Sequence, residues 1–256
     1  MNALFVGDAH LGVPASPAYI SLLRLLERCE QPMDYLIILG DLFDLWLGDN
    51  RKLIALHRPV LEVLRQLRGR GTRIYYLKGN HDIFMGQIFH KELDIQVCED
   101  ELVLELEGCR IFATHGDTIN PRDYGYRLLR IILRSKLIEF LSRSLNDSMV
   151  YSIAQLVSSH THADPHSQNE PAVRALFLSY ARNLLDQDYH VVILGHSHIP
   201  QWEVHTRCTP QKIYLNPGSW FEHSTYIWYQ NGHFYLRRLQ EREEEILFDF
   251  KCQKGP

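Results

Sequence analysis

Short apolar runs alternate with longer segments of helical periodicity over the first part of the chain. The runs have the length of buried strands and cover residues 3–7, 35–39 and 73–77. Between them, apolar residues recur at helical spacing after Pro17 and again over residues 52–68. This alternation of strands and helices predicts an α/β protein.

The pattern changes further along the chain. A hairpin is predicted over residues 102–106 and 109–114, and a buried strand over 190–194. Four later segments alternate apolar and polar residues as strands do: 201–206, 211–215, 224–230 and 233–238, the last two joined by an Asn-Gly turn. These strands predict a second sheet packed on the first. The acidic run Glu241 to Glu245 is interpreted as a solvated turn.

Residues 120–189 show no strand pattern and are predicted to form three helices. The interval between His115 and His196 is about twice the intervals between the earlier motifs described below, which leaves roughly forty residues beyond an ordinary loop. We therefore expect a single domain over residues 1–256 that carries a helical insertion at 120–189.

Composition narrows the class of protein. A charged fraction of 23% with 45% hydrophobic residues excludes wholesale disorder, and a net charge of −4 argues against nucleic acid as a partner. No apolar run approaches the roughly 20 residues of a membrane helix. The start of the chain lacks the pattern of a signal peptide, and the five cysteines are scattered with no CxxC pair. These features predict a reduced, cytoplasmic protein without an obligate protein partner.

Five short motifs follow predicted strands and share one design, in which small residues leave polar side chains at the strand end. They are Gly7-Asp8-Ala9-His10, Gly40-Asp41-Leu42-Phe43-Asp44, Gly79-Asn80-His81-Asp82, His115-Gly116-Asp117 and Gly195-His196-Ser197-His198. Each alone also fits a turn or a core histidine. Five in succession indicate a site, because ligands of α/β sheets bind at the carboxyl ends of strands.

The residue types suit metal ions. Carboxylate and amide oxygens combined with imidazole nitrogens fit Mn²⁺, Fe²⁺ or Zn²⁺ better than Ca²⁺ or Mg²⁺ alone. Seven candidate ligands are too many for one ion, whereas two ions that share a carboxylate would use them all. The sequence thus predicts a two-metal site.

The motifs resemble those of the calcineurin-like metallophosphoesterase superfamily. The resemblance implies a four-layer α/β/β/α sandwich and a hydrolase with two divalent metal ions, Mn²⁺ first among the three candidates. It implies two ligand sets joined by Asp41 as a bridge: Asp8, His10 and His198 for one metal, and Asn80, His115 and His196 for the other. It further implies that His81 protonates the leaving oxygen, that Asp82 orients the His81 ring, and that Asp44 holds a ligand in place.

Longer strings are similar to those of UDP-2,3-diacylglucosamine pyrophosphatases. They are the segment from Gly40 to Asn50, His115-Gly116-Asp117-Thr118, and Asp123-Tyr124-Gly125-Tyr126 before the helical insertion. This resemblance implies that the insertion caps the site and holds acyl chains. The reaction would give UMP and 2,3-diacylglucosamine 1-phosphate on the way to lipid A. The chain departs from that family at His81 and Ile199, where the family usually has Arg.

The insertion begins with apolar residues interleaved with cations. Residues 122–143 hold six basic and two acidic side chains, which suits an amphiphilic phosphorylated substrate or an anionic membrane surface, such as the inner face of the inner membrane. The alternative is a packed helix pair whose cations face water. The candidate substrate-binding residues are Asp123, Tyr126, Arg130, Leu133 and Leu137.

Two other functions stay open on the sequence. A phosphodiesterase or phosphatase for another nucleotide or phosphorylated lipid is favoured by His81, because an alkoxide leaving group needs a proton donor. A scaffold that keeps the metals without catalysis is the non-enzymatic alternative, and the complete ligand set argues against it.

Overall fold

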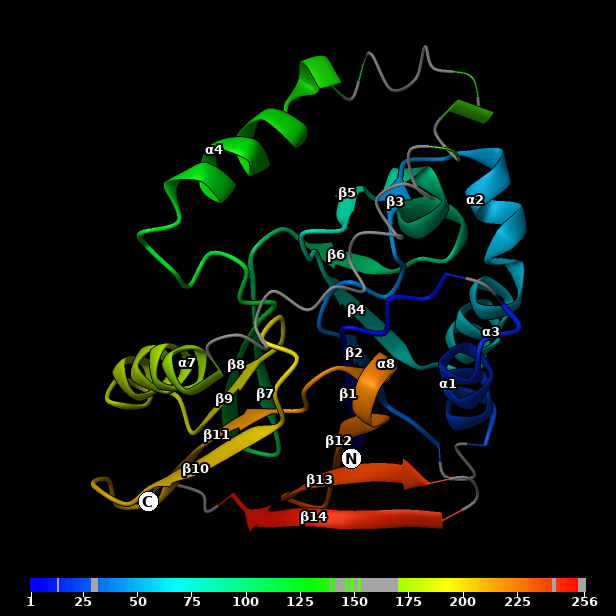
Figure 1. The fold of residues 1–256 in the computed structure, drawn as a ribbon. Helices are drawn as coiled ribbons and strands as arrows, with labels where there is room; N and C mark the ends of the chain where they lie inside the picture. The colour runs from blue at the N-terminus through cyan, green and yellow to red at the C-terminus, as the bar shows by residue number, and fades with distance from the viewer. Residues whose placement is uncertain are drawn as a thin grey trace.

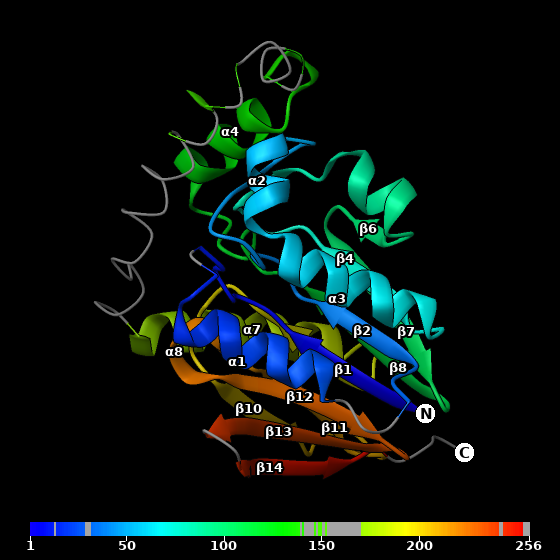
Figure 2. The same cartoon turned by 90° about the vertical axis from the view of Figure 1, so that its right-hand side faces the viewer.

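The computed structural model describes residues 1–12, 14–28, 32–138, 140, 146, 148–149, 152, 170–240 and 243–252. Two sheets face each other at the centre of the molecule, with helices on their outer sides (Figures 1 and 2). This arrangement is the predicted α/β/β/α sandwich. The late strands expected to form the second sheet are divided, however: Gln201–His205 and Lys212–Asn216 belong to it, whereas Thr225–Gln230 and His233–Gln240 extend the first sheet. No helix in the described ranges is both long and apolar enough to cross a membrane.

The first sheet has the order β14-β13-β12-β1-β2-β4-β6. Its strands are β1 (Asn2–Val6), β2 (Tyr35–Ile38), β4 (Arg73–Leu77), β6 (Gln96–Cys98), β12 (Thr225–Gln230), β13 (His233–Gln240) and β14 (Glu243–Lys251). The second sheet has the order β10-β11-β9-β8-β7. Its strands are β7 (Glu101–Leu106), β8 (Cys109–Thr114), β9 (Val191–Leu194), β10 (Gln201–His205) and β11 (Lys212–Asn216). A small sheet joins β3 (Trp46–Leu47) to β5 (Asp82–Phe84).

Alternation along the strands assigns each side chain to a layer. In β1, Phe5 packs between the two sheets, whereas Leu4 and Val6 pack under the helices of the first sheet. Those helices are α1 (Pro17–Glu27), α2 (Arg51–Leu56) and α3 (Arg58–Gly69), with a π-helical turn η1 (Ile88–Glu92) and the short α8 (Trp220–His223).

Helix α7 (Glu170–Leu185) covers the outer side of the second sheet. Its Phe177 and Ala181 pack in one apolar cluster with Val192 of β9 and Tyr214 of β11. This helix lies within residues 120–189, so the expectation that the whole range forms a cap needs correction at its C-terminal end. Helix α4 (Tyr124–Leu133), at the start of residues 120–189, projects beyond the sheets. The residues between α4 and α7 fall largely outside the described ranges.

The direction of the parallel strands places the motifs together. Strands β1, β2 and β4 run parallel, as do β8 and β9, so that Val6 is level with Ile38 and Thr114 with Leu194. All five motifs therefore follow strand ends at the same edge of the sandwich.

Three differences from the sequence pattern have physical causes. The helix expected over residues 52–68 is two helices, because Pro59 has no N–H to continue the hydrogen-bond ladder of α2. The acidic run 241–245 was expected to be a turn; residues 241–242 lie outside the described ranges, and residues 243–245 begin β14 instead. The first residues of this edge strand are exposed, so they show no apolar pattern. Cys109 and Cys252 form a disulfide, which corrects the expectation of fully reduced cysteines. The two cysteines are 143 residues apart, so their spacing in the sequence did not indicate that they pair.

Candidate metal centre

The predicted ligands converge from both sheets. Asp8 follows β1, Asp41 follows β2 and Asn80 follows β4 in the first sheet, while His115 and His196 follow β8 and β9 in the second. Within the described ranges, groups of potential ligand atoms lie within 4.8 Å of one another at this edge. They comprise Asp8, His10 and His198; Asp41, His115 and His196; and His10, Asp41 and His81.

Five of these residues have a left-handed backbone, which is uncommon for residues other than glycine. Their φ angles lie between 42° and 62°, and the residues are Asp8, His10, Asp41, His196 and His198. Such conformations cluster at functional sites, where the surrounding structure holds them. Here the N–H of Asp8 donates to the carbonyl of Gly40 at 3.1 Å, and the N–H of His196 donates to Asp8 Oδ2 at 2.9 Å.

Two motif glycines are required by close packing at the site. A Cβ on Gly79 would collide with the Asp41 carboxylate. A Cβ on Gly40, at a φ of +96°, would lie 2.5 Å from Nδ1 of His115. These positions leave space only for glycine, so the ligand side chains can approach the backbone of neighbouring loops.

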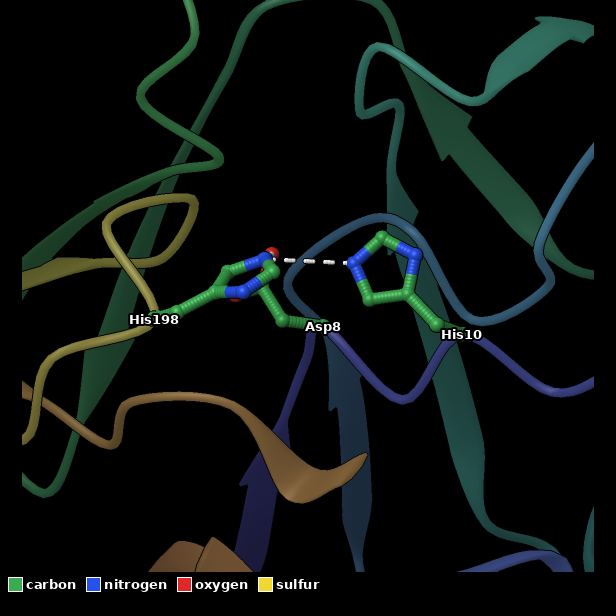
Figure 3. Close-up of side chains that lie close together, drawn as sticks. All are labelled: Asp8, His10 and His198. Atoms are coloured by element: carbon green, nitrogen blue, oxygen red, sulfur yellow. Dashed lines mark hydrogen bonds and ion pairs between the residues drawn. The ribbon is translucent and has the colours of Figure 1, made fainter. Parts of the chain in front are cut away.

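The first ligand set is Asp8, His10 and His198 (Figure 3). The Nε2 atoms of the two histidines are 3.2 Å apart, and His198 Nε2 is 3.6 Å from Asp8 Oδ1. Two ligands of one tetrahedral ion, each bound at about 2.0–2.1 Å, stand roughly 3.3 Å apart. Asp8 Oδ1 is also buried without a hydrogen bond from the described residues, so this group fits a cation.

The second ligand set centres on His115. Its Nδ1 donates to the carbonyl of Leu39 at 2.8 Å, which leaves Nε2 directed at the site. Nε2 is 3.3 Å from Asp41 Oδ2 and 3.1 Å from Asn80 Oδ1. His196 packs against the His115 ring at 5.0 Å between ring centres. Asp41 belongs to this set and also lies within 4.8 Å of His10, a member of the first set. A ligand that bridges two metals needs this position between the two sets.

Burial and the neighbouring charges shift the pKa values of these groups strongly. Burial lowers the pKa of His10 to about 3, so this ring is neutral and available as a ligand. Burial also acts to lower the pKa of His115, but the Asp41 carboxylate outweighs it and raises the value to about 10. His115 and Asp41 thus form a buried ion pair, and a bound divalent cation would take the place of the proton.

His81 lies beside both ligand sets. Its backbone N–H donates to Asp41 Oδ1 at 2.8 Å, and its ring meets that of His10 edge to face with ring centres 4.8 Å apart. Its Nδ1 is 2.6 Å from the carbonyl oxygen of Asp44 and donates to it. This bond fixes the ring and leaves Nε2 for a substrate oxygen.

Asp82 does not orient the His81 ring, contrary to expectation. Its Oδ2 accepts from the N–H groups of Asp41 and Gly79, and its Oδ1 accepts from the Tyr76 hydroxyl at 2.8 Å. Burial and the nearby Asp41 raise the pKa of Asp82 to about 6. The carboxylate therefore joins the loops after β2 and β4, and the orienting group for His81 is the Asp44 carbonyl.

Helix α8 supports the first ligand set and was missed in the sequence. Ser219 caps this helix, its hydroxyl donates to the carbonyl of Asp8 at 2.9 Å, and its N–H donates to the carbonyl of His198. Glu222 Oε1 is 3.9 Å from Nδ1 of His198, on the opposite side of the ring from Asp8. Carboxylates in this position orient histidine ligands. In the sequence, the capping residue Ser219 followed by Trp-Phe-Glu was the available signal for this short helix.

The polar side of α4 faces the metal centre. Asp123 caps the helix by accepting from the N–H of Tyr126 at 3.0 Å, and the Tyr126 hydroxyl donates to Asp117. Arg130 pairs with Asp117 at 2.9 Å and with Asp100 at 2.6 Å. Two predicted substrate-binding residues, Tyr126 and Arg130, therefore hold the helix on the domain, and a third, Asp123, caps it.

The apolar side of α4 faces outward. Tyr124, Leu128 and Ile131, spaced one and two turns apart, are 76%, 61% and 69% exposed, and no residue of this helix is buried. Leu137 beyond it is 65% exposed, whereas Leu133 packs against the apolar cluster beneath the first sheet's helices. Against the alternative of a packed helix pair with cations in water, Arg130 and Arg134 bond to the domain and the apolar side of α4 is exposed, whereas Arg127 does face water. The second helix of that pair would fall largely outside the described residues.

The sandwich fold and the paired ligand sets define a metal-dependent phosphoester hydrolase. The model of the family described as calcineurin-like phosphoesterase matches residues 1–200, and the chain belongs to that family.

Similar proteins extend the comparison over most of the chain. The chain is 28% identical over 242 residues to UDP-2,3-diacylglucosamine hydrolase of Aeromonas salmonicida, which covers 94% of each chain. It is 33% identical over 204 residues to the protein of the same name from Photorhabdus laumondii, covering 78% of this chain and 83% of the relative. GAP50 of Plasmodium shares the fold, with a TM-score of 0.55 at 9% identity over 100% of this chain and 89% of that one.

Proposed function

We propose that the protein hydrolyses the pyrophosphate bond of UDP-2,3-diacylglucosamine and releases UMP and 2,3-diacylglucosamine 1-phosphate. The observation that carries this proposal is the orientation of α4, whose polar side is fixed beside the metal centre and whose apolar side is exposed. Acyl chains can pack on that side while the pyrophosphate reaches the ligands. The names of the Aeromonas and Photorhabdus relatives support the same substrate.

The chemistry follows from the ligand geometry. Two divalent ions, with Mn²⁺ preferred over Fe²⁺ or Zn²⁺, would be held by Asp8, His10, Asp41, Asn80, His115, His196 and His198. When bound, they acidify a water and stabilise charge on the phosphoryl oxygens. The Asp44 carbonyl holds His81 at Nδ1, so that Nε2 faces the leaving oxygen. When both ring nitrogens carry a proton, Nε2 donates its proton to that oxygen.

A peripheral position on an anionic membrane is part of the proposal. The substrate's acyl chains reside in a bilayer, and the exposed face of α4 combines apolar side chains with cations such as Arg127 nearby. Apolar burial and attraction to anionic lipids together favour binding at such an interface.

The second candidate is a phosphodiesterase or phosphatase that acts on another nucleotide or phosphorylated lipid. The specific observation in its favour is His81 with its fixed ring. An alkoxide leaving group gains more from a proton donor than a phosphate leaving group does.

The decisive experiment is turnover by a Leu128→Ser/Ile131→Ser variant on two substrates, the diacylated sugar nucleotide and a small chromogenic phosphodiester, with Mn²⁺ present. Each methylene withdrawn from water contributes about 0.8 kcal/mol, so we expect KM for the diacylated substrate to rise at least tenfold. The small substrate should be unaffected. Val103→Ser on β7, 44% exposed, is the matched control. Equal losses on both substrates would refute the role of α4, and turnover of the small diester alone by the wild type would favour the second candidate.

A further inference from the structure

Asp186, His205 and Cys208 form a second group of potential metal ligands. One ligand atom from each lies within 4.8 Å of the other two, the same separation found in the sets of the metal centre. Asp186 directly follows α7, His205 ends β10, and Cys208 lies in the turn between β10 and β11. Cys208 is a free thiol.

The group lies at the opposite end of the second sheet from the metal centre. Strand β10 starts just after the His198 loop and runs away from it to His205, and Asp186 precedes the start of β9, whose other end carries His196. Figure 1 shows the β10–β11 turn at the lower left, away from the ends of β1 and β2. The two sets of ligands are therefore independent.

The geometry of the group is already close to that of a metal site. His205 is 95% buried, since its exposed fraction is 5%, and its Nε2 is 3.0 Å from Asp186 Oδ1. Co-ligands of a tetrahedral zinc ion stand roughly 3.3 Å apart at their usual bond lengths. Lys212 of β11 donates to the carbonyls of Leu185 and Gln187 on either side of Asp186, which fixes the loop that carries this carboxylate.

The ligand types of this group indicate which metal would bind. A thiolate, an imidazole and a carboxylate are all established zinc ligands, and the thiolate disfavours Mg²⁺, Ca²⁺ and Mn²⁺. The thiolate and carboxylate together carry two negative charges, which balance one Zn²⁺ and reduce the cost of placing the charge beside a buried histidine. We propose that Asp186, His205 and Cys208 bind one Zn²⁺, with solvent in the fourth position, and so tie the end of α7 to the β10–β11 turn.

Cobalt provides a test that separates this site from the metal centre. The full-length protein is stripped of metal, its thiols are kept reduced, and Co²⁺ is added while the sulfur-to-cobalt charge-transfer absorption is recorded. No candidate ligand of the metal centre is a thiolate, so that band reports a cysteine ligand alone. We expect one equivalent of Co²⁺ to produce the band and Zn²⁺ to abolish it.

The variants identify the ligands. Cys208→Ser should lose the band completely, whereas Cys98→Ser, which changes the other free cysteine of the described chain, should keep it. Asp186→Asn changes a side chain that is 59% exposed and conserves its size, and it should require more Co²⁺ for half of the absorbance. Absence of the band in the wild type, or its persistence in Cys208→Ser, would overturn the proposal and leave Asp186 and His205 as a structural hydrogen-bonded pair.

Discussion

Arg134, at the end of α4, donates to the carbonyl oxygen of Gly79 at 2.8 Å. Gly79 immediately precedes Asn80, a candidate ligand, and its N–H is held by Asp82. The helix with the exposed apolar side is thus bonded directly to a loop of the metal centre. Polar contacts of Arg134, Arg130 and Tyr126 set its position relative to the ligands, together with the packing of Leu133 on the apolar cluster below.

Replacing this arginine should separate substrate binding from metal binding. A hydrogen bond made by a charged group contributes about 1.5–3 kcal/mol, so Arg134→Gln should raise KM for an amphiphilic substrate roughly tenfold or more. Metal content should not change. Arg70→Gln, at an exposed arginine that directly follows α3, is the control and should behave as wild type. Identical kinetics for the two variants would show that the Gly79 contact does not position the helix.

His81→Gln should retain both metals and slow turnover by roughly 10²–10⁴, the usual range for a lost proton donor. The reason is that His81 touches Asp41 through its backbone, which the substitution preserves, while its ring faces the site. Metal analysis and steady-state kinetics on the same preparation check both parts. His90→Gln, at an exposed histidine, serves for comparison. Loss of one metal would instead make His81 a ligand alongside His10 and Asp41.

Glu222→Gln should weaken the first ligand set without abolishing it. Burial acts to lower the pKa of His198, but Glu222 and Asp8 outweigh it and raise the value, which reflects the carboxylate held against this ring. Loss of an orienting partner usually costs about 10–100-fold in metal affinity. Competition with a chelator measures the affinity, and added metal should restore turnover. Glu105→Gln on β7 is the exposed control. An unchanged affinity would contradict the role given to α8.

His57 should make stability fall as the pH falls. It is buried among Tyr19, Phe43 and Trp46, and burial lowers its pKa to about 3. Between that value and the unfolded pKa of about 6.5, the unfolded chain binds a proton at His57 that the folded chain does not. Acidification below pH 6.5 therefore favours the unfolded chain and lowers the free energy of unfolding, whereas above about pH 6.5 His57 imposes no such loss.

The slope can be measured by difference. Below pH 6 the free energy of unfolding should decrease by up to about 1.4 kcal/mol per pH unit more in the wild type than in His57→Phe. Denaturant titrations at several pH values give both curves, and the shared contributions of other groups cancel. Parallel curves would mean that His57 is protonated in the folded protein.

The sequence was most informative where a side chain's role depends on its own strand. Asp8, Asp41 and His115 each follow an apolar run, and the carboxyl ends of parallel strands must meet at one edge. Roles that depend on another segment could not be predicted. Asp82 was expected to orient the adjacent His81 ring, but it accepts a hydrogen bond from the N–H of Asp41. The group that orients His81 is the backbone carbonyl of Asp44, and a backbone group cannot be predicted from residue type.

The same limit applies to α4 and to the cysteines. Periodicity shows that α4 has an apolar side, but only the acidic residues of other loops, Asp100 and Asp117, determine which side faces the domain. Cys109 and Cys252 are brought together by the closure of the two sheets, which local spacing does not encode.

The origin of the ligands has a consequence for the order of folding. In the first set, Asp8 and His10 follow a strand of one sheet and His198 follows a strand of the other; in the second set, Asp41 and His115 are divided in the same way. Neither sheet holds a complete set, so a metal cannot act as a nucleus around which the chain first collapses. The sandwich must close before either ion finds its ligands, and metal uptake therefore marks a late step in the maturation of the protein.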